Sequence, residues 1–282
     1  MAREYPSRKS RCAGSLSESR ALSDESPGRY RRRDMNTLRL WVNTLLGRET
    51  ILQAELLDVP LRIVVEARRE IRRIHAISAE AALIERMLRF LSNGDVVYDV
   101  GANIGLIGLI LARHSTKAAR IHCFEPEPRN FSRLLRNIAE NQLSQRISAH
   151  RVALSDDSGE VELFVRGGPG EGRHSIVEST GSTGSIRIPA QTAFRFATSE
   201  GDAPDLVKID VEGAEGRVLA GMEPLFRRRQ PREIFLELHL KGDGDLMPGG
   251  TRIRDWMVER GYEPVWELER GKSRHAHFRL PS

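Results

Sequence analysis

The sequence predicts a single α/β domain built on a doubly wound, mostly parallel sheet. Between residues 96 and 153, short apolar runs typical of buried strands alternate with helical patterns in the order βαβαβ, which implies parallel strands. A glycine-rich turn follows the first of these strands, and an acidic residue ends the second. The 282 residues, of which 39% are hydrophobic, suffice for one such domain with added segments.

The N-terminal region divides into two parts. Residues 1–34 are rich in serine, arginine and glycine and lack an apolar period, so we expect a flexible basic arm. Met35 follows it as a candidate start of the native protein. Residues 35–77 hold a helical stretch around Leu38–Leu46 and then a mixed pattern, so the domain proper is expected over residues 78–282.

Each element of the first half follows from its pattern. An amphipathic helix is predicted over Ser78–Leu91, with Ser78 as its N-cap and Asn93-Gly94 after its end. The strands and helices that alternate after it are Val96–Val100, Leu106–Arg113, Arg120–Glu125, Arg129–Gln142 and Ile147–Ala153.

In the second half the pattern changes before the alternation resumes. Short alternating runs at Val161–Val165 and Ser185–Ile188, separated by glycine-rich stretches, predict an inserted β-hairpin near the active site. The later elements are strand Leu206–Asp210, helix Ala214–Phe226, strand Glu233–Leu240, helix Thr251–Arg260, and strands Glu263–Leu268 and His275–Leu280.

Composition excludes several classes of protein. Residues 1–34 supply most of the net charge of +5, so the remainder is nearly neutral and we expect no nucleic-acid partner. The longest apolar run, Leu106–Ala112, is too short for a membrane span. Cys12 and Cys123 form neither a disulfide framework nor a zinc spacing, which favours a reducing cytoplasm. The sequence does not fix the oligomeric state.

The chemistry begins at the turn between the first strand and its helix. Gly101 and Gly105 remove side chains where the backbone must approach a ligand, and Asp99 can accept a hydrogen bond from a charged amino group. Glu125 ends the second strand, where a carboxylate can bind both hydroxyls of an adenosine ribose. This combination indicates S-adenosylmethionine as the cofactor.

An oxidoreductase is one alternative, because nicotinamide dinucleotides also use an acid at the end of the second strand. The spacing of Gly101, Gly105 and Gly108, however, matches neither G-x-G-x-x-G nor the loop of short-chain dehydrogenases. The Tyr-x-x-x-Lys pair of those enzymes occurs here only as Tyr5 and Lys9, within the arm. A noncatalytic cofactor-binding protein of the same fold is the second alternative.

Four blocks of the chain occur in the order found in the FkbM family of methyltransferases, which the chain resembles over about residues 80–239. The blocks are Tyr-Asp-Val-Gly-Ala-Asn-Ile-Gly (98–105), Phe-Glu-Pro (124–126), Ala-Leu-Ser-Asp (153–156) and Lys-Ile-Asp-Val-Glu-Gly-Ala-Glu (208–215). The resemblance implies a Rossmann-like class I methyltransferase fold, S-adenosylmethionine as cofactor, and O-methylation of a hydroxyl on a sugar, polyketide or other small metabolite. At Gln191-Thr192-Ala193-Phe194 the family commonly has Thr-Leu-Asp, so one aspartate is missing.

The blocks assign roles to the cofactor-binding residues. The residues expected at the methionine part are Asp99, Gly101, Asn103 and Gly105. Glu125 is expected at the ribose, and Ala153 and Asp156 near the adenine.

The acceptor side is expected at the end of the fourth strand, where Asp210 is a candidate base, a second contact to the methionine part, or a ligand of a divalent cation. Glu237 and His239 alternate on the fifth strand, so they share a face and can meet Asp210 as further catalytic candidates. Lys208 is expected to reach toward water or to pair with an acid. His174 and Ser175 are candidates for a flap over a small-molecule or glycan hydroxyl acceptor.

Overall fold

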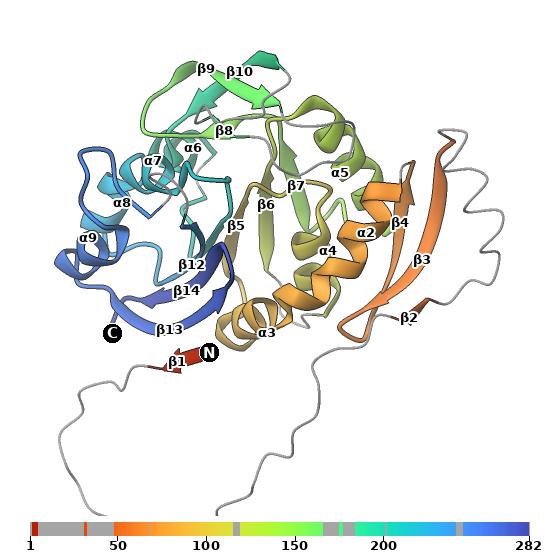
Figure 1. Ribbon diagram of the computed structural model, residues 1–282, viewed down its shortest axis with the longest axis horizontal. Helices are drawn as coiled ribbons and strands as arrows, with labels where there is room; N and C mark the ends of the chain where they lie inside the picture. Colours follow the sequence, from red (N-terminus) through yellow and green to blue (C-terminus); the bar gives the residue numbers. More distant parts are fainter. Residues whose placement is uncertain are drawn as a thin grey trace, which may run out of the picture.

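A central sheet covered on both faces forms the body of the protein (Figure 1). The computed structural model describes residues 2–4, 31–32, 48–66, 68–114, 119–165, 175–176, 184–200, 202–240 and 245–281. The sheet has eight strands in the order β1-β13-β14-β12-β11-β5-β6-β7. Their bounds are β1 Ala2–Glu4, β5 Val96–Val100, β6 Arg120–Phe124, β7 Ile147–His150, β11 Leu206–Ile209, β12 Glu233–His239, β13 Glu263–Arg270 and β14 Ser273–Arg279.

The five strands from β12 to β7 run parallel, which confirms the predicted doubly wound sheet. One departure is β14, which lies between β12 and β13 and is antiparallel to both. Strand β5 shows why helices must cover both faces. Val97 enters one hydrophobic core, whereas Val96 and Tyr98, on the opposite side of the pleat, enter the other.

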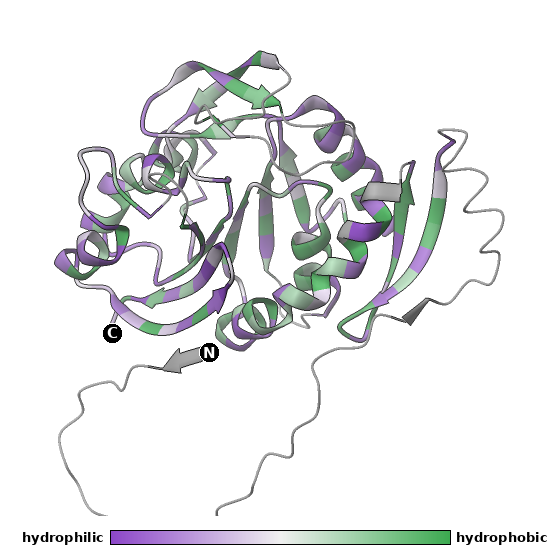
Figure 2. Ribbon diagram, viewed as in Figure 1, coloured by the Kyte–Doolittle hydropathy of each residue, from purple (hydrophilic) through white to green (hydrophobic). Residues whose placement is uncertain are grey.

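The helices fall into two groups according to the core that they bury. The first core takes residues from α3 (Ala81–Phe90), α4 (Leu106–His114) and α5 (Pro128–Glu140). Much of α4 is coloured hydrophobic in Figure 2, and Leu106 to Ala112 are all buried. The second core takes residues from α6 (Ala193–Glu200), α7 (Glu215–Ala220), α8 (Glu223–Arg227) and α9 (Ile253–Glu259).

Two predicted helix features are wrong. Ser78 is not an N-cap, because it lies in the 3-10 helix η1 (Ile77–Glu80) that follows α2 (Arg68–Ala76), and its Oγ donates to the carbonyl of His75 at 3.1 Å. The predicted helix 214–226 is interrupted at Gly221, where α7 ends before α8 begins. A Cβ on Gly221 would lie 2.0 Å from the carbonyl oxygen of Ser155, so the backbone passes too close for a side chain.

The predicted inserted hairpin is confirmed. Strands β9 (Gly159–Val165) and β10 (Gly184–Gln191) pair antiparallel, and β8 (Ala153–Leu154) joins β10 in parallel, so β7 ends earlier than predicted. This small sheet lies beyond the ends of the central strands (Figure 1). Thr192 then caps α6, a helix that the sequence pattern did not predict, by accepting from the backbone N–H of Arg195 at 3.0 Å.

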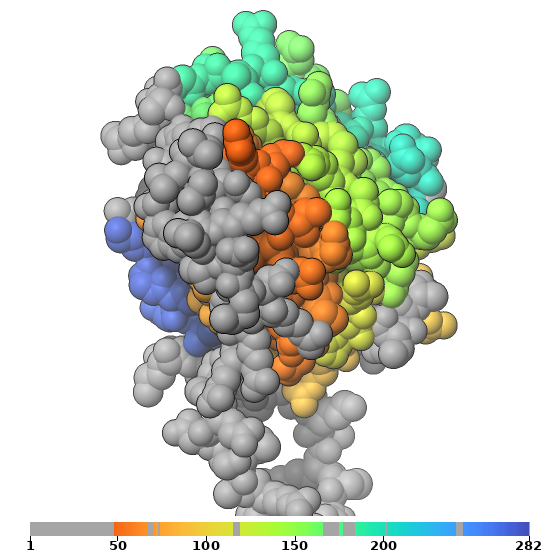
Figure 3. Space-filling view, turned by 90° about the vertical axis from the view of Figure 1, so that its right-hand side faces the viewer, coloured from red at the N-terminus to blue at the C-terminus, as the bar shows by residue number. Residues whose placement is uncertain are grey.

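A second hairpin, of β3 (Thr50–Leu56) and β4 (Val59–Val65), packs against α5, and the strand β2 (Arg31–Arg32) pairs with its β3 edge. Figure 3 looks onto this face, where the hairpin is orange and the region of α5 is yellow-green. Asn137, fully buried on α5, accepts from the backbone N–H of Val64 at 2.8 Å and donates to the carbonyl of Ile104 at 2.8 Å. One side chain therefore ties the hairpin to the glycine-rich turn.

Other predictions lie outside the described residues, among them the helix at Leu38–Leu46, most of the arm over residues 1–34, and His174. No helix in the described part of the chain is long and apolar enough to cross a membrane. The cytoplasmic location stays a prediction.

We expect Asn137→Ala to lower the free energy of unfolding by about 1–3 kcal/mol, because it leaves the buried N–H of Val64 and the carbonyl of Ile104 without partners. The measurement is urea unfolding. The control is Leu135→Ala, on the exposed face of the same helix, which we expect to change stability by less than about 0.5 kcal/mol. Equal losses in the two variants would contradict this role for Asn137.

Candidate functional site

Two adjoining cavities open at the carboxyl ends of β5, β6 and β11, the edge at which parallel sheets bind ligands. The larger has a volume of about 600 Å³, part of it open to solvent, and the smaller about 350 Å³. Gly101, Asn103 and Asp210 line both, so a single ligand can extend from one cavity into the other. Concave sites at this edge of a parallel sheet commonly bind a small molecule or cofactor.

The glycine-rich turn between β5 and α4 forms the floor shared by the cavities. Gly101 has φ of +76°, and a Cβ there would lie 1.9 Å from the carbonyl oxygen of Asp210, so only glycine fits. Gly105 lines neither cavity; its missing Cβ makes room for Leu134 of α5, at 2.4 Å. Gly105 therefore has a packing role in this structure, and its contact with a cofactor stays a prediction.

Glu125 organises this turn and lines the larger cavity. Its Oε2 accepts from the backbone N–H of Asn103 at 2.8 Å, and its Oε1 accepts from that of Glu127 at 3.0 Å. The side chain is buried, and Phe124 and Leu154 supply apolar surface beside it. A buried carboxylate among apolar groups is well suited to accept hydrogen bonds from a ligand's hydroxyls.

Lys208 lies beneath the floor, between two acids. Its ammonium lies 3.2 Å from Asp99 and 3.8 Å from Asp210, and it donates to the carbonyl of Gly101 at 3.1 Å. Burial alone would lower the pKa of Lys208, but the two carboxylates outweigh burial and raise it above its usual range. The expected pairing of Lys208 is therefore found. Asp99 is fully buried and lines neither cavity, so it acts on the site through Lys208.

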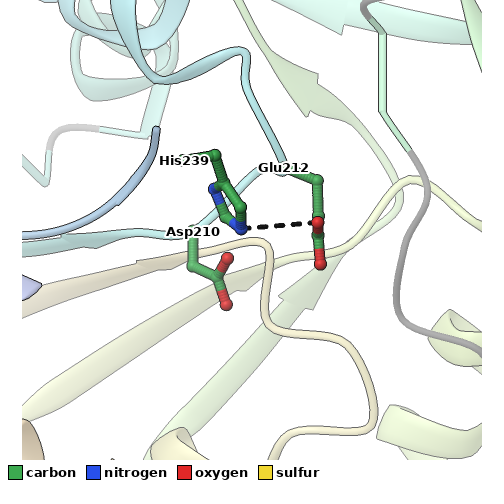
Figure 4. Close-up of side chains that lie close together, drawn as sticks. All are labelled: Asp210, Glu212 and His239. Atoms are coloured by element: carbon green, nitrogen blue, oxygen red, sulfur yellow. Dashed lines mark ion pairs between the residues drawn. The ribbon is translucent and has the colours of Figure 1, made fainter. Parts of the chain in front are cut away.

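The predicted meeting of Asp210 and His239 is found, with Glu212 as the third member (Figure 4). One ligand atom from each of the three lies within 4.8 Å of the others. His239 Nε2 is 3.3 Å from Glu212 Oε2, and His239 Nδ1 is 2.9 Å from Glu215 Oε1. Glu215 is fully buried at the start of α7 and also accepts from the backbone N–H of Gly213.

These carboxylates shift the ionisation of the cluster. Burial would lower the pKa of His239, but the hydrogen bond to Glu215 and the charges of Glu215 and Asp210 raise it to about 9. Burial and Asp210 raise the pKa of Glu212 to about 7. His239 is therefore protonated at neutral pH in this arrangement, which argues against its predicted role as a base, whereas Glu212 can exchange a proton near neutrality.

Glu237 does not join this cluster. Its Oε1 accepts from Ser273 Oγ at 2.8 Å, and its Oε2 lies 3.4 Å from His275, directly opposite it on β14. Burial would raise the pKa of Glu237, but the contacts with His275, Ser273 and Arg270 lower it to about 2. Glu237 lines neither cavity, so the predicted catalytic role finds no support in the geometry, because β14 supplies its partners.

The small sheet closes the larger cavity. Ala153, Leu163 and Ile176 line it, which places Ala153 as predicted and adds two apolar residues that the sequence reading did not name. Asp156 does not line it; its carboxylate accepts from Ser155 Oγ at 2.8 Å. Ser175, the described half of the predicted flap, is buried and pairs with the backbone of Phe164.

Glu80 is a polar cavity residue that the sequence analysis missed. It ends η1 and lines the smaller cavity with Lys208 and Asp210. Burial and the charge of Asp210 raise its pKa to about 7, against the opposing effect of Lys208. In the sequence, the only signal at Glu80 was its position in the first turn of the predicted helix Ser78–Leu91, which does not indicate a binding residue. Phe194, at the position of the missing aspartate, packs against the second core and lines neither cavity.

A histidine pair supports the wall of the larger cavity. The ring of His150 stacks on Phe124, with 5.1 Å between centroids, and its Nε2 lies 3.0 Å from Nδ1 of His122. His122 Nε2 in turn lies 3.2 Å from Asp202. Burial, and to a lesser extent His122, lowers the pKa of His150 to about 4.

A parallel sheet with a glycine turn, a buried strand-end acid and two joined cavities at its carboxyl edge defines a Rossmann-like protein that binds a nucleotide-type cofactor. The chain belongs to the FkbM family of methyltransferases. Residues 99–264 match the model of the methyltransferase FkbM domain, which confirms the resemblance in the four sequence blocks.

Similar proteins include named methyltransferases. The chain is 32% identical over 187 residues to the hexuronic acid methyltransferase AglP of Haloferax volcanii, covering 66% of this chain and 74% of AglP. It is 30% identical to the 31-O-demethyl-FK506 methyltransferase FkbM of Streptomyces tacrolimicus, covering 52% and 66%, and 27% identical to the 2-O-methyltransferase NoeI of Sinorhizobium fredii, covering 62% and 75%. A solved precorrin-6y C5,15-methyltransferase from Geobacter metallireducens aligns with a TM-score of 0.44 at 12% identity, covering 72% and 89%.

We expect Lys208→Met to lower the free energy of unfolding by about 3–5 kcal/mol, because it leaves the buried carboxylate of Asp99 without its ion pair. In the double variant Asp99→Asn with Lys208→Met, no buried charge remains at position 99, so much of the loss should be recovered. Urea unfolding measures both. A double variant no more stable than Lys208→Met would contradict the pairing.

We expect His150 to make stability fall with acid. The unfolded chain protonates this imidazole near pH 6.5, whereas the folded chain does so only near pH 4, so the unfolded state binds more protons between these values. In urea unfolding, the stability of His150→Phe relative to the parent should therefore rise as pH falls from about 6.5 to about 4. A difference that does not change with pH would refute the assignment.

Proposed function

We propose that this methyltransferase transfers a methyl group from S-adenosylmethionine to a hydroxyl of a sugar or polyketide-like small molecule. The observation that carries the proposal is the pair of cavities joined at Gly101 and Asp210: the larger holds the buried acid Glu125 among apolar side chains, and the smaller adds Glu80 beside Asp210. S-adenosylmethionine has the same two halves, since an uncharged adenosine adjoins a sulfonium and an amino acid.

The chemistry of the lining residues fits the cofactor in one orientation. Glu125 would accept from the ribose hydroxyls, and Leu154, Leu163 and Ile176 would contact the adenine in the larger cavity. The smaller cavity would hold the amino-acid end, with the ammonium group facing Glu80 and Asp210. The reverse orientation would place the uncharged adenine beside the charged Lys208 and Asp210, and would leave Leu154, Leu163 and Ile176 without an apolar ligand surface.

The acceptor class is supported by the relatives. AglP is named for a hexuronic acid, FkbM for a demethylated FK506 and NoeI as a 2-O-methyltransferase. The names of FkbM and NoeI specify an oxygen as the methylated atom, the name of AglP specifies a sugar acid, and we extend this class to the present chain.

When bound, S-adenosylmethionine supplies a methyl group attached to a positively charged sulfur. A hydroxyl oxygen can attack the carbon of that methyl group, and the sulfur is the leaving group. The chain's own residues then have to align that oxygen, exclude water and take its proton. Alignment of this kind can contribute roughly 7–11 kcal/mol, and a general base a factor of about 10²–10⁴. Asp210, where the cavities meet, is our proposed proton acceptor, and Glu212 is a second carboxylate within the larger cavity.

We expect Glu125→Gln to weaken the binding of both S-adenosylmethionine and S-adenosylhomocysteine by roughly 10- to 150-fold, because hydrogen bonds to a charged group contribute about 1.5–3 kcal/mol. Calorimetric titration measures this loss. Glu160→Gln, on the exposed part of β9, is the matched control and should bind both as the parent does.

Three results would contradict the proposal. Binding of NADH without binding of S-adenosylmethionine would favour an oxidoreductase. Equal affinity in Glu125→Gln and the parent would remove Glu125 from the ribose site. Tight binding without methyl transfer to any sugar or polyketide hydroxyl offered would favour a noncatalytic binding protein.

A further inference from the structure

The cluster of Asp210, Glu212 and His239 has the composition of a metal site. Two carboxylate oxygens and one imidazole nitrogen lie within 4.8 Å of one another, and all three side chains are half-buried beside the larger cavity (Figure 4). Three protein ligands of this kind leave positions open for water or a substrate oxygen, as catalytic metal sites require.

The second observation is the carboxylate behind the imidazole. His239 Nδ1 contacts Glu215 Oε1 at 2.9 Å, which directs Nε2 toward Asp210 and Glu212. Histidines that bind metals usually make such a contact through their other ring nitrogen. Glu215 is fully buried, and its Oε2 has no hydrogen-bond partner among the described residues, so this buried carboxylate is only partly compensated.

The excess of negative charge around His239 also favours binding of a cation. Asp210, Glu212 and Glu215 surround the imidazole of His239, whose proton offsets only one of the three carboxylates; a cation bound at Nε2 would replace that proton. The buried ammonium of Lys208 is shared with Asp99, which it approaches more closely than Asp210. Divalent cations compensate such an excess directly, and carboxylate with imidazole suits Mn²⁺ and related first-row ions.

We propose that Asp210, Glu212 and His239 bind one divalent first-row cation, with Glu215 holding the imidazole in place. The role of the ion rests on the proposed function, whereas its binding does not. In that role the ion would hold the acceptor's hydroxyl oxygen beside the cofactor cavity. Each residue offers one atom to the ion, so the other carboxylate oxygen of Asp210 stays available for the hydroxyl proton.

The experiment is a titration of the full chain with Mn²⁺ after removal of metals by a chelator, with free Mn²⁺ followed by electron paramagnetic resonance. We expect one saturable site per chain. Affinity should fall at least about tenfold in His239→Gln and Asp210→Asn, and by about 10- to 100-fold in Glu215→Gln. The matched control is His75→Gln, an exposed histidine on α2, which should bind as the parent does.

A spectroscopic measurement on the parent protein does not depend on whether the variants fold. Bound Mn²⁺ should show electron spin-echo modulation from one imidazole nitrogen. Absence of that modulation, absence of saturable binding, or unchanged affinity in a folded His239→Gln would each overturn the site.

Titration of the same samples with S-adenosylhomocysteine separates the two proposals. If S-adenosylhomocysteine binds but Mn²⁺ does not, only the metal site fails. If Mn²⁺ binds but S-adenosylhomocysteine does not, the metal site stands and the proposed function fails.

Discussion

The rest of the site depends on the buried ion pairs that the Lys208 ammonium makes with Asp99 and Asp210. Neighbouring parallel strands end at the same edge, so β5 and β11 bring Asp99 and Asp210 close together in a region of low dielectric. Lys208 compensates both and also bonds the carbonyl of Gly101. The floor of the two cavities therefore rests on a charge balance as well as on the absence of a Cβ at Gly101.

The parts of the fold that could be predicted are those with an unambiguous pattern. Strand β5 matches its predicted bounds because it is buried on both faces and its sequence, apolar except for Asp99, is ended by glycine. The β3–β4 hairpin was missed for a specific reason. Its two-residue turn uses Leu57 and Asp58, both with positive φ, in place of Asn-Gly, and Pro60 lies inside the second strand.

The candidate site divides in the same way. Gly101, Asn103 and Glu125 could be found because each lies within a few residues of the end of a recognisable strand. Glu80 could not, since it enters from η1, and a helix pattern gives no indication of which cavity its first turn will line. Glu237 was wrongly predicted to join Asp210. The alternation of residues shows which face of β12 a side chain occupies, but it does not show which strand pairs with β12, and β14 places His275 opposite Glu237.

Asn137 carries a further consequence for the limits of the catalytic unit. Its amide bonds the β4 backbone on one side and the glycine-rich turn on the other, while Leu52 and Ile63 of the hairpin share a core with α4 and α5. The β3–β4 hairpin therefore stabilises the glycine-rich turn beneath the cavities, although the hairpin precedes every family motif in the chain. A fragment trimmed to residues 99–264 would keep the four blocks except Tyr98 and lose the support that holds the first of them in shape.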